Sequence, residues 1–300
     1  MPTFRVVRIG SAARDMLAQS VGTEADVHAV FERSFYLLTE HGLVCVGARA
    51  IGNGPINVLI DAVPERGFEH AGIFREAKAQ ITEHGIAFGD DVLIEKGTDV
   101  PVWEPAGWPL PAEGWERALT RLREVIAAGA PKEGLARHVL DPRRAVTMVE
   151  QSAQMPVGEI LKMLPEVLRS REVPVALSGA LTLLVGLGPG LTPSGDDVLA
   201  GMALTLTAIA QTKVRDAIWE AVGPELEMLT VPVSAMHLAL AFDGMGAEAL
   251  HDAIATVLSG RVELVEAAVA RVAEIGATSG WDALAGVLMT LEAVRDRRVV

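Results

Sequence analysis

The chain has 300 residues, of which 50% are hydrophobic, 22% charged and 4% aromatic, and its formal net charge is -13 at pH 7. This composition supplies enough apolar surface for a sizeable core and excludes intrinsic disorder as the main state. The acidic balance and the lack of a Lys/Arg cluster exclude a nucleic-acid-binding face, which needs basic residues to neutralise phosphates.

The N-terminal sequence and the single cysteine indicate the cellular compartment in which the protein works. The first residues lack the apolar run of a signal peptide, and apolar stretches such as 200–210 are too short to cross a bilayer. One cysteine, Cys45, excludes a disulfide framework and favours a reducing compartment. We therefore expect a cytoplasmic protein that has no membrane or nucleic-acid partner.

Residues 1–110 are predicted to form a β-rich N-terminal domain. Two pairs of short β-rich segments predict two hairpins, and the paired segments are residues 43–47 with 56–60 and residues 92–94 with 100–103. Asn53-Gly54, between the first two segments, is typical of a tight hairpin turn. Residues 68–82 fit no single pattern, and a short helix between strands is one interpretation of them.

A proline- and glycine-rich stretch between Glu104 and Pro111 predicts a domain boundary. Beyond it the apolar pattern is helical, which predicts an all-α domain over residues 111–300. Helices are expected near residues 112–128, 157–169, 175–185, 193–210, 212–229, 232–242, 246–259, 261–275 and 279–295. The predicted fold class is therefore α+β, with a β-rich N-terminal domain followed by an all-α C-terminal domain.

The most informative stretch is Gly-Leu-Gly-Pro-Gly-Leu-Thr-Pro-Ser-Gly-Asp-Asp, at residues 186–197 between two apolar helices. Glycines and prolines in such a place reduce stability and suit a backbone that must approach a ligand closely. The acidic pair that follows Gly195 excludes a Walker phosphate loop, which carries Lys and Ser or Thr there. The candidate substrate-binding residues of this loop are Gly188, Gly190, Thr192, Ser194 and Gly195.

A second copy of the helix start lies 85 positions later, where residues 279–286 align with 194–201. Both copies have the form Ser-x-x-Asp, so we expect each Ser to cap its helix and each Asp to bond back to the cap. Gly201 and Gly286 predict that the two helices cross closely near their N-termini. Two such termini aimed at one place favour a small anion, although simple capping is the alternative interpretation. The second copy and the end of the first add Asp197, Ser279, Gly280 and Asp282 to the candidate substrate-binding residues.

The two aspartates of the first copy are expected to differ in role. Asp197 matches Asp282 and is interpreted as mainly a structural cap, whereas Asp196 aligns with Trp281 and is not needed for capping. Asp196 is therefore the candidate catalytic residue, as a metal ligand, a hydrogen-bond partner or a proton acceptor. Mg²⁺, an arginine from elsewhere or a partner subunit are the candidates to balance this acidic pair beside an anion, and the sequence does not identify a set of metal ligands.

The glycine-rich string, followed by x-Leu-Ala-Gly, resembles the hallmark of the bacterial AllH family, which is named after a component of oxamate carbamoyltransferase. Residues 275–286 resemble the second motif of that family, and Ser234 and residues 238–241 fall where the family has a Ser- and Ala-rich helix. The resemblance implies a β-rich N-terminal part and a helical C-terminal part. It also implies phosphorolysis of oxalurate to oxamate and carbamoyl phosphate, in anaerobic allantoin catabolism and together with two other subunits.

Two hypotheses for the function remain open at this point. In the first, the chain is a subunit of a multi-subunit carbamoyl- or acyl-transferase that acts on a small anionic substrate. In the second, it binds or senses a small anionic metabolite without turnover. The sequence favours neither decisively, because it shows no complete catalytic set.

Overall fold

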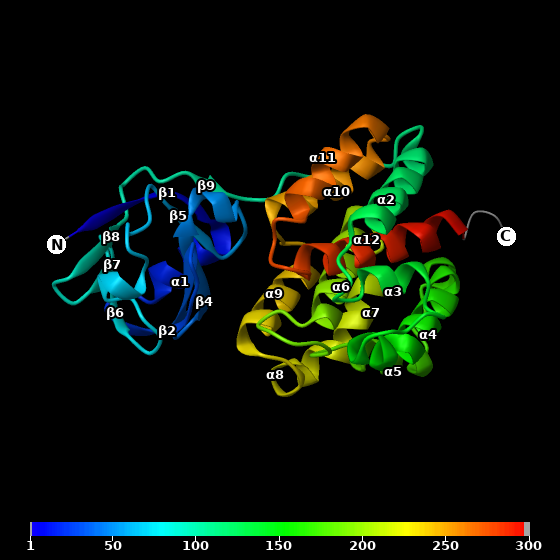
Figure 1. Cartoon of the computed structure of the whole chain (residues 1–300), viewed down its shortest axis with the longest axis horizontal. Helices are drawn as coiled ribbons and strands as arrows, with labels where there is room; N and C mark the ends of the chain where they lie inside the picture. The colour runs from blue at the N-terminus through cyan, green and yellow to red at the C-terminus, as the bar shows by residue number, and fades with distance from the viewer. Residues whose placement is uncertain (1, 297–300) are drawn as a thin grey trace. The chain divides into compact units, whose positions relative to one another are not determined.

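The computed structural model describes residues 2–296, and its contacts divide the chain into two compact units, residues 1–105 and 106–300. The first unit is a β-barrel and the second is helical (Figure 1). Each unit has its own hydrophobic core. The predicted α+β class is therefore confirmed. No helix within residues 2–296 is long and apolar enough to cross a membrane.

A nine-stranded sheet forms the first unit of the described chain. Its strands are β1 (Thr3–Gly10), β2 (Glu24–Val30), β3 (Ser34–Thr39), β4 (Gly42–Ala48), β5 (Asn57–Ile60), β6 (Lys78–Thr82), β7 (Gly85–Phe88), β8 (Val92–Glu95) and β9 (Val102–Trp103). They follow the order β5-β4-β3-β2-β6-β7-β8-β1-β9, and β1 also pairs with β5, which closes the barrel. Helix α1 (Ser11–Gln19) follows β1 and buries Ala13 and Leu17 against the barrel core.

Both predicted hairpins are wrong. Strands β4 and β5 are neighbours but run parallel, and strands β8 and β9 pair with β1 and not with each other. A tight type I′ turn at Asn53-Gly54 needs a positive φ at both residues, and of residues 52–55 only Gly52 has one, at 76°. Residues 68–82 hold one short 3-10 helix, Glu69–Ala71, between strands β5 and β6, which agrees with the interpretation of a short helix between strands, and the segment ends in strand β6.

Two hairpins that the patterns above did not predict share the sequence Thr-Glu-His-Gly, at residues 39–42 and 82–85. In each, the Thr hydroxyl donates to the Gly carbonyl oxygen and accepts the His N–H. The φ angles of Gly42 and Gly85 are 134° and 137°, in a region that favours glycine. The repeated sequence thus encodes the same turn twice.

The helices of the second unit largely follow the predicted pattern. They are α2 (Trp115–Gly129), α3 (Ala136–Leu140), α4 (Met148–Ser170), α5 (Val175–Thr182), α6 (Ser194–Ala208), α7 (Thr212–Val222), α8 (Leu226–Leu229), α9 (Pro232–Phe242), α10 (Glu248–Leu258), α11 (Val265–Val272) and α12 (Ser279–Asp296). Helix α3 was not predicted. The helix expected over 212–229 is divided into α7 and α8 by a 3-10 turn, Gly223–Glu225.

Helix α4 begins at Met148 and not near residue 157, because a capping box starts it. Thr147 Oγ1 accepts the N–H of Glu150 at 3.1 Å, and Glu150 Oε2 accepts the N–H of Thr147 at 2.8 Å. Pro156 lies inside the helix and does not end it. The Thr-x-x-Glu sequence was the available signal for this helix start.

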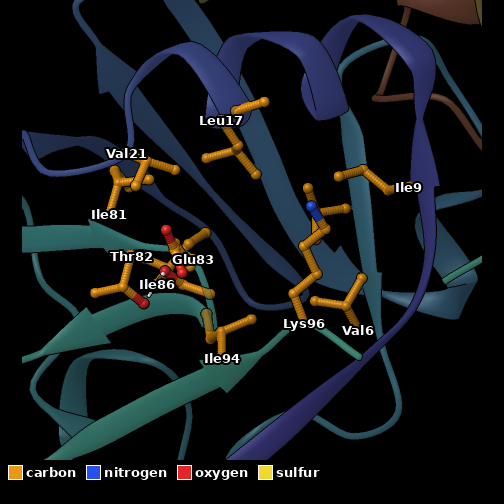
Figure 2. Close-up of a pocket in the computed structure, with 13 residues that line it drawn as sticks. Val6, Ile9, Leu17, Val21, Ile81, Thr82, Glu83, Ile86, Ile94 and Lys96 are labelled. Carbon is orange, nitrogen blue, oxygen red and sulfur yellow. Dashed lines mark hydrogen bonds between the residues drawn. The ribbon is translucent and has the colours of Figure 1, made fainter. Parts of the chain in front are cut away.

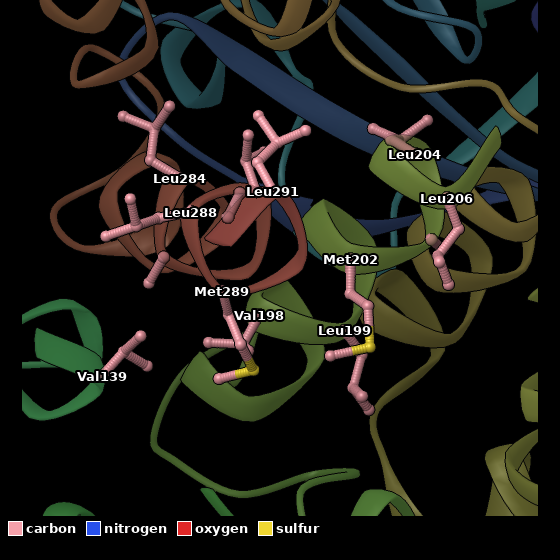
Figure 3. Close-up of a cluster of buried hydrophobic side chains, with 14 of the residues drawn as sticks. Val139, Val198, Leu199, Met202, Leu204, Leu206, Leu284, Leu288, Met289 and Leu291 are labelled. Atoms are coloured by element: carbon pink, nitrogen blue, oxygen red, sulfur yellow. The ribbon is translucent and has the colours of Figure 1, made fainter. Parts of the chain in front are cut away.

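Helices α6 and α12 pack against each other in the core of the helical unit, where α12 also lies against α2, α3 and α4. A Cβ on Gly201 would lie 1.9 Å from the carbonyl oxygen of Ala283, and one on Gly286 would lie 2.0 Å from that of Val198. The backbone of each helix therefore packs directly against the glycine of the other helix, and this is the close packing that the repeat predicts. Figure 3 shows apolar side chains at this contact, among them Val198, Leu199, Met202, Leu284, Leu288 and Met289.

Candidate functional site

The first turns of α6 and α12 lie side by side because the two glycines bring the helices together. The side chains of the two Ser-x-x-Asp segments then pair across the helices: the Ser279 hydroxyl contacts Asp197, and the Ser194 hydroxyl contacts Asp282. The predicted capping box at the start of α6 is wrong, because the N-cap residue is Pro193 and no described side chain caps this helix. Each serine hydroxyl therefore contacts the carboxyl group on the opposite helix and does not cap its own helix.

Asp282 is fully buried and supports the start of α3. Its Oδ1 accepts the N–H groups of Leu135, at 2.6 Å, and Ala136, at 3.0 Å. The backbone approaches this closely because Gly134 has a φ of 82°, and a Cβ there would lie 2.7 Å from both carboxylate oxygens. Burial raises the pKa of Asp282 to about 6, since the hydrogen bonds offset the loss of solvent only in part.

Asp197 is the equivalent residue on α6, and part of its surface reaches solvent. Burial of its carboxyl group raises the pKa well above the usual value, and the nearby charge of Asp282 raises it further. The contact with the Ser279 hydroxyl lowers this pKa, whereas the charge of Asp196 adds a smaller increase. Asp197 therefore keeps its proton at pH values at which an exposed aspartate is ionised.

The glycine-rich loop reaches the start of α12 through Thr192, whose Oγ1 lies 2.7 Å from Oγ of Ser279. Gly188 has a φ of 125°, and a Cβ on it would lie 2.8 Å from the backbone nitrogen of Ser194. This glycine lets the loop fold back over the first turn of α6. Thr192, Ser279 and Asp197 consequently form a row of polar groups, with the Ser279 hydroxyl between the other two. We call these three residues the polar row.

Asp196 faces a different part of the unit and is 2% exposed. Its Oδ1 accepts the N–H of Gly186 at 2.7 Å, and its Oδ2 accepts the hydroxyl groups of Ser234, at 2.6 Å, and Thr230. Burial raises the pKa of Asp196, and these hydrogen bonds lower it. Asp196 thus ties the first glycine of the loop to the segment that starts α9. No pattern in the sequence pointed to Thr230.

The remaining candidate glycines have separate roles. A Cβ on Gly195 or Gly280 would lie 1.9 Å from a backbone carbonyl oxygen, that of Leu184 or Val272 respectively. These two glycines let α6 and α12 begin against the end of the preceding helical segment. Gly190 has a φ of 95° and open space where a Cβ would stand, so its backbone lies at the loop surface.

The structure therefore brings together the polar row and the N-terminal ends of α6 and α12, and it places Asp196 and Asp282 in the interior. Helix N-termini favour anions, because their N–H groups and the helix dipole both attract negative charge. Among residues 2–296, no group of three or more His, Cys, Asp or Glu side chains is arranged to hold a metal ion.

Two family models match the sequence. The model described as oxamate carbamoyltransferase subunit AllH matches residues 184–291, a range that holds the glycine-rich loop, α6 and the start of α12. The model described as AllH family N-terminal domain matches residues 5–98, which make up most of the barrel. No curated protein and no solved structure matches the chain.

Proposed function

Because the chain belongs to the AllH family, we propose that it is a subunit of an oxamate carbamoyltransferase and that other subunits complete the enzyme. The observation that carries this proposal is the range of the AllH match, residues 184–291, which contains all three residues of the polar row. The substrates of such an enzyme are small anions, and the hydroxyl groups of Thr192 and Ser279 beside the positive ends of the α6 and α12 dipoles favour negative charge.

The reaction we propose is the phosphorolysis of oxalurate. A phosphate oxygen attacks the carbamoyl carbon, and the bond between this carbon and the oxamate nitrogen breaks. The nitrogen takes up one proton from the proton donor, the attacking phosphate gives up one proton that restores the donor, and the products are carbamoyl phosphate and oxamate. In this scheme Thr192 and Ser279 share one hydrogen bond at 2.7 Å, the remaining O–H of the pair donates to the bound anion, and the helix N-termini balance part of its charge.

Asp197 is the proton donor in this proposal. The departing nitrogen needs a proton, and a carboxyl group with a raised pKa keeps one available near neutral pH. Asp196, the candidate from the sequence, already accepts hydrogen bonds from Gly186, Thr230 and Ser234. We therefore move the catalytic assignment from Asp196 to Asp197.

The test measures carbamoyl phosphate formed from oxalurate and phosphate by the purified chain, alone and with the other subunits. We expect activity in the mixture only. Asp197→Asn should lower the turnover number at least about 100-fold, the usual effect of losing a general acid, without preventing assembly of the complex. Asp243→Asn, at an exposed position, is the matched control and should keep full activity.

Two outcomes contradict parts of this proposal. Full activity of Asp197→Asn in the mixture would reject the proton-donor assignment. Calorimetric binding of oxamate or carbamoyl phosphate, with no turnover in any mixture, would favour the alternative function, a protein that binds or senses a small anion.

A further inference from the structure

The barrel of the first unit contains a cavity of about 240 Å³ that the proposed function does not use. Its apolar walls come from several strands and from α1, and they include Val6, Ile9, Leu17, Ile81, Ile86 and Ile94 (Figure 2). Protein interiors are packed as densely as organic crystals, with few voids larger than one water molecule. This cavity has room for about eight water molecules at about 30 Å³ each, and its walls offer them few hydrogen bonds.

Two charged side chains also line the cavity, Lys96 and Glu83, and Glu83 is exposed whereas Lys96 is half-buried among the apolar walls. Lys96 follows the last residue of β8, and Figure 2 shows its side chain extending along the cavity toward α1, on the side of Ile9. No carboxylate in the described chain lies within 4.0 Å of its ammonium group. The nearby Thr82 hydroxyl already donates to the carbonyl oxygen of Gly85 at 3.1 Å. The Lys96 charge is therefore available to a ligand.

We propose that the cavity binds a small monocarboxylate with an apolar chain of roughly five to eight carbons, a size below that of typical ligand sites of about 300–1,000 Å³. The carboxylate pairs with Lys96, and the chain lies among Ile81, Ile86 and Ile94. A dianion fits less well, because its second charge would lose water against apolar walls and gain no partner. This inference is independent of the proposed function, since all of its residues belong to the barrel.

The experiment uses the full chain and three probes, hexanoate, hexanamide and acetate, with dissociation constants from ligand-observed NMR titration. We expect hexanoate to bind at least tenfold more tightly than hexanamide, because only hexanoate pairs with the Lys96 charge. Acetate should bind at least tenfold more weakly than hexanoate, because it lacks the apolar chain. Lys96→Met should remove the preference for hexanoate over hexanamide.

Two further variants make the test independent of folding and of net charge. Lys78→Met removes the same charge from the barrel at an exposed residue that pairs with Asp26, so it should keep the preference. Val21→Trp changes a residue at the cavity that is 42% exposed, so the fold should tolerate it, and it should weaken both six-carbon ligands.

Three results would overturn the inference. The first is no saturable binding of hexanoate at millimolar concentration, which would mean that the lysine stem only covers apolar surface. The second is equal binding of acetate and hexanoate, as expected for a surface ion pair. The third is an unchanged preference for hexanoate in Lys96→Met.

Discussion

Three aspartates near one helix crossing have different environments because each carboxyl group faces a different set of donors. Asp282 accepts two backbone N–H groups, and Asp196 accepts one backbone N–H and two hydroxyl groups. Asp197 contacts one hydroxyl group and lies beside a second carboxyl group. The same residue type therefore supplies two structural supports and one group with an available proton, as neighbouring carboxyl groups often do in enzymes.

The pH dependence of stability tests the environment of Asp282. Its pKa of about 6 in the folded protein lies above the value of about 3.9 in an unfolded chain. Its contribution to stability is therefore complete below about pH 4 and is lost as the pH rises through about 6. Asp282→Asn keeps an oxygen acceptor but cannot ionise. When the pH rises from about 4.5 to about 7.5, the free energy of unfolding of the variant should increase by roughly 1–3 kcal/mol relative to that of the wild type.

Urea unfolding of both proteins at the two pH values measures this difference. Parallel pH profiles for the wild type and Asp282→Asn would show that Asp282 ionises in the folded protein as it does in the unfolded chain.

Removal of the Asp196 carboxylate should affect stability directly. In Asp196→Ala, the Gly186 N–H and the Ser234 and Thr230 hydroxyls lose their acceptor in the interior, which should lower the free energy of unfolding by about 2–4 kcal/mol. Asp243→Ala, on the surface, should change it by less than about 0.5 kcal/mol. Unchanged chemical denaturation of Asp196→Ala, together with lost activity in the subunit mixture, would return the catalytic assignment to Asp196.

At the scale of elements, the glycines between α6 and α12 give a sharp test. A Cβ on Gly201 would lie 1.9 Å from a backbone oxygen, so Gly201→Ala should force the helices apart and cost at least about 1–3 kcal/mol. Gly158 lies inside α4 with open space where a Cβ would stand. Gly158→Ala should therefore stabilise the protein by about 1 kcal/mol, through helix propensity alone. Thermal unfolding should show opposite changes in Tm for the two variants, and changes of the same sign would contradict the packing argument.

The sequence indicated helices more reliably than strand pairing, because helical hydrogen bonds connect residues close in the chain. Apolar spacing and small residues near helix ends located α6, α9 and α12 within a few residues. The partners of β8 and β9 depend on β1, about 90 residues earlier in the chain, and no local pattern encodes that pairing. The Thr-Glu-His-Gly repeat was a usable local signal for the two true hairpins.

The candidate site was predictable only in part, for a similar reason. The repeat placed the two helix starts together, which brought Asp197 near Ser279 and Asp282. The environment of each carboxyl group depends on hydrogen-bond donors far away in the chain, such as Thr230 for Asp196 and Leu135 for Asp282. Spacing within the motif carries no information about those donors. The repeat therefore predicted the helix crossing but not the role of each aspartate.

At the scale of the whole molecule, the two separate cores predict two independent folding units. The apolar clusters of the barrel and of the helical unit have no buried residue in common, and the contacts divide the chain at Pro105. Fragments 1–105 and 106–300 should each unfold cooperatively on heating, with the circular dichroism of a β protein and an α protein respectively. Both lengths lie in the usual range for single domains. A fragment that stays unfolded would contradict this division.

The contact between α6 and α12 has the form of an isologous interface, in which each side presents the same patch to the other. In a homodimer one gene encodes both sides, so every substitution changes the contact twice. Here the two sides are different segments of one chain. Equivalent positions hold Asp196, which accepts a hydrogen bond from Ser234 in the first turn of α9, and Trp281, which packs on Gly129 at the end of α2. The two halves of such a contact can keep their glycines while one copy carries a carboxylate that ties the loop to α9 and the other carries an indole that anchors its helix on α2.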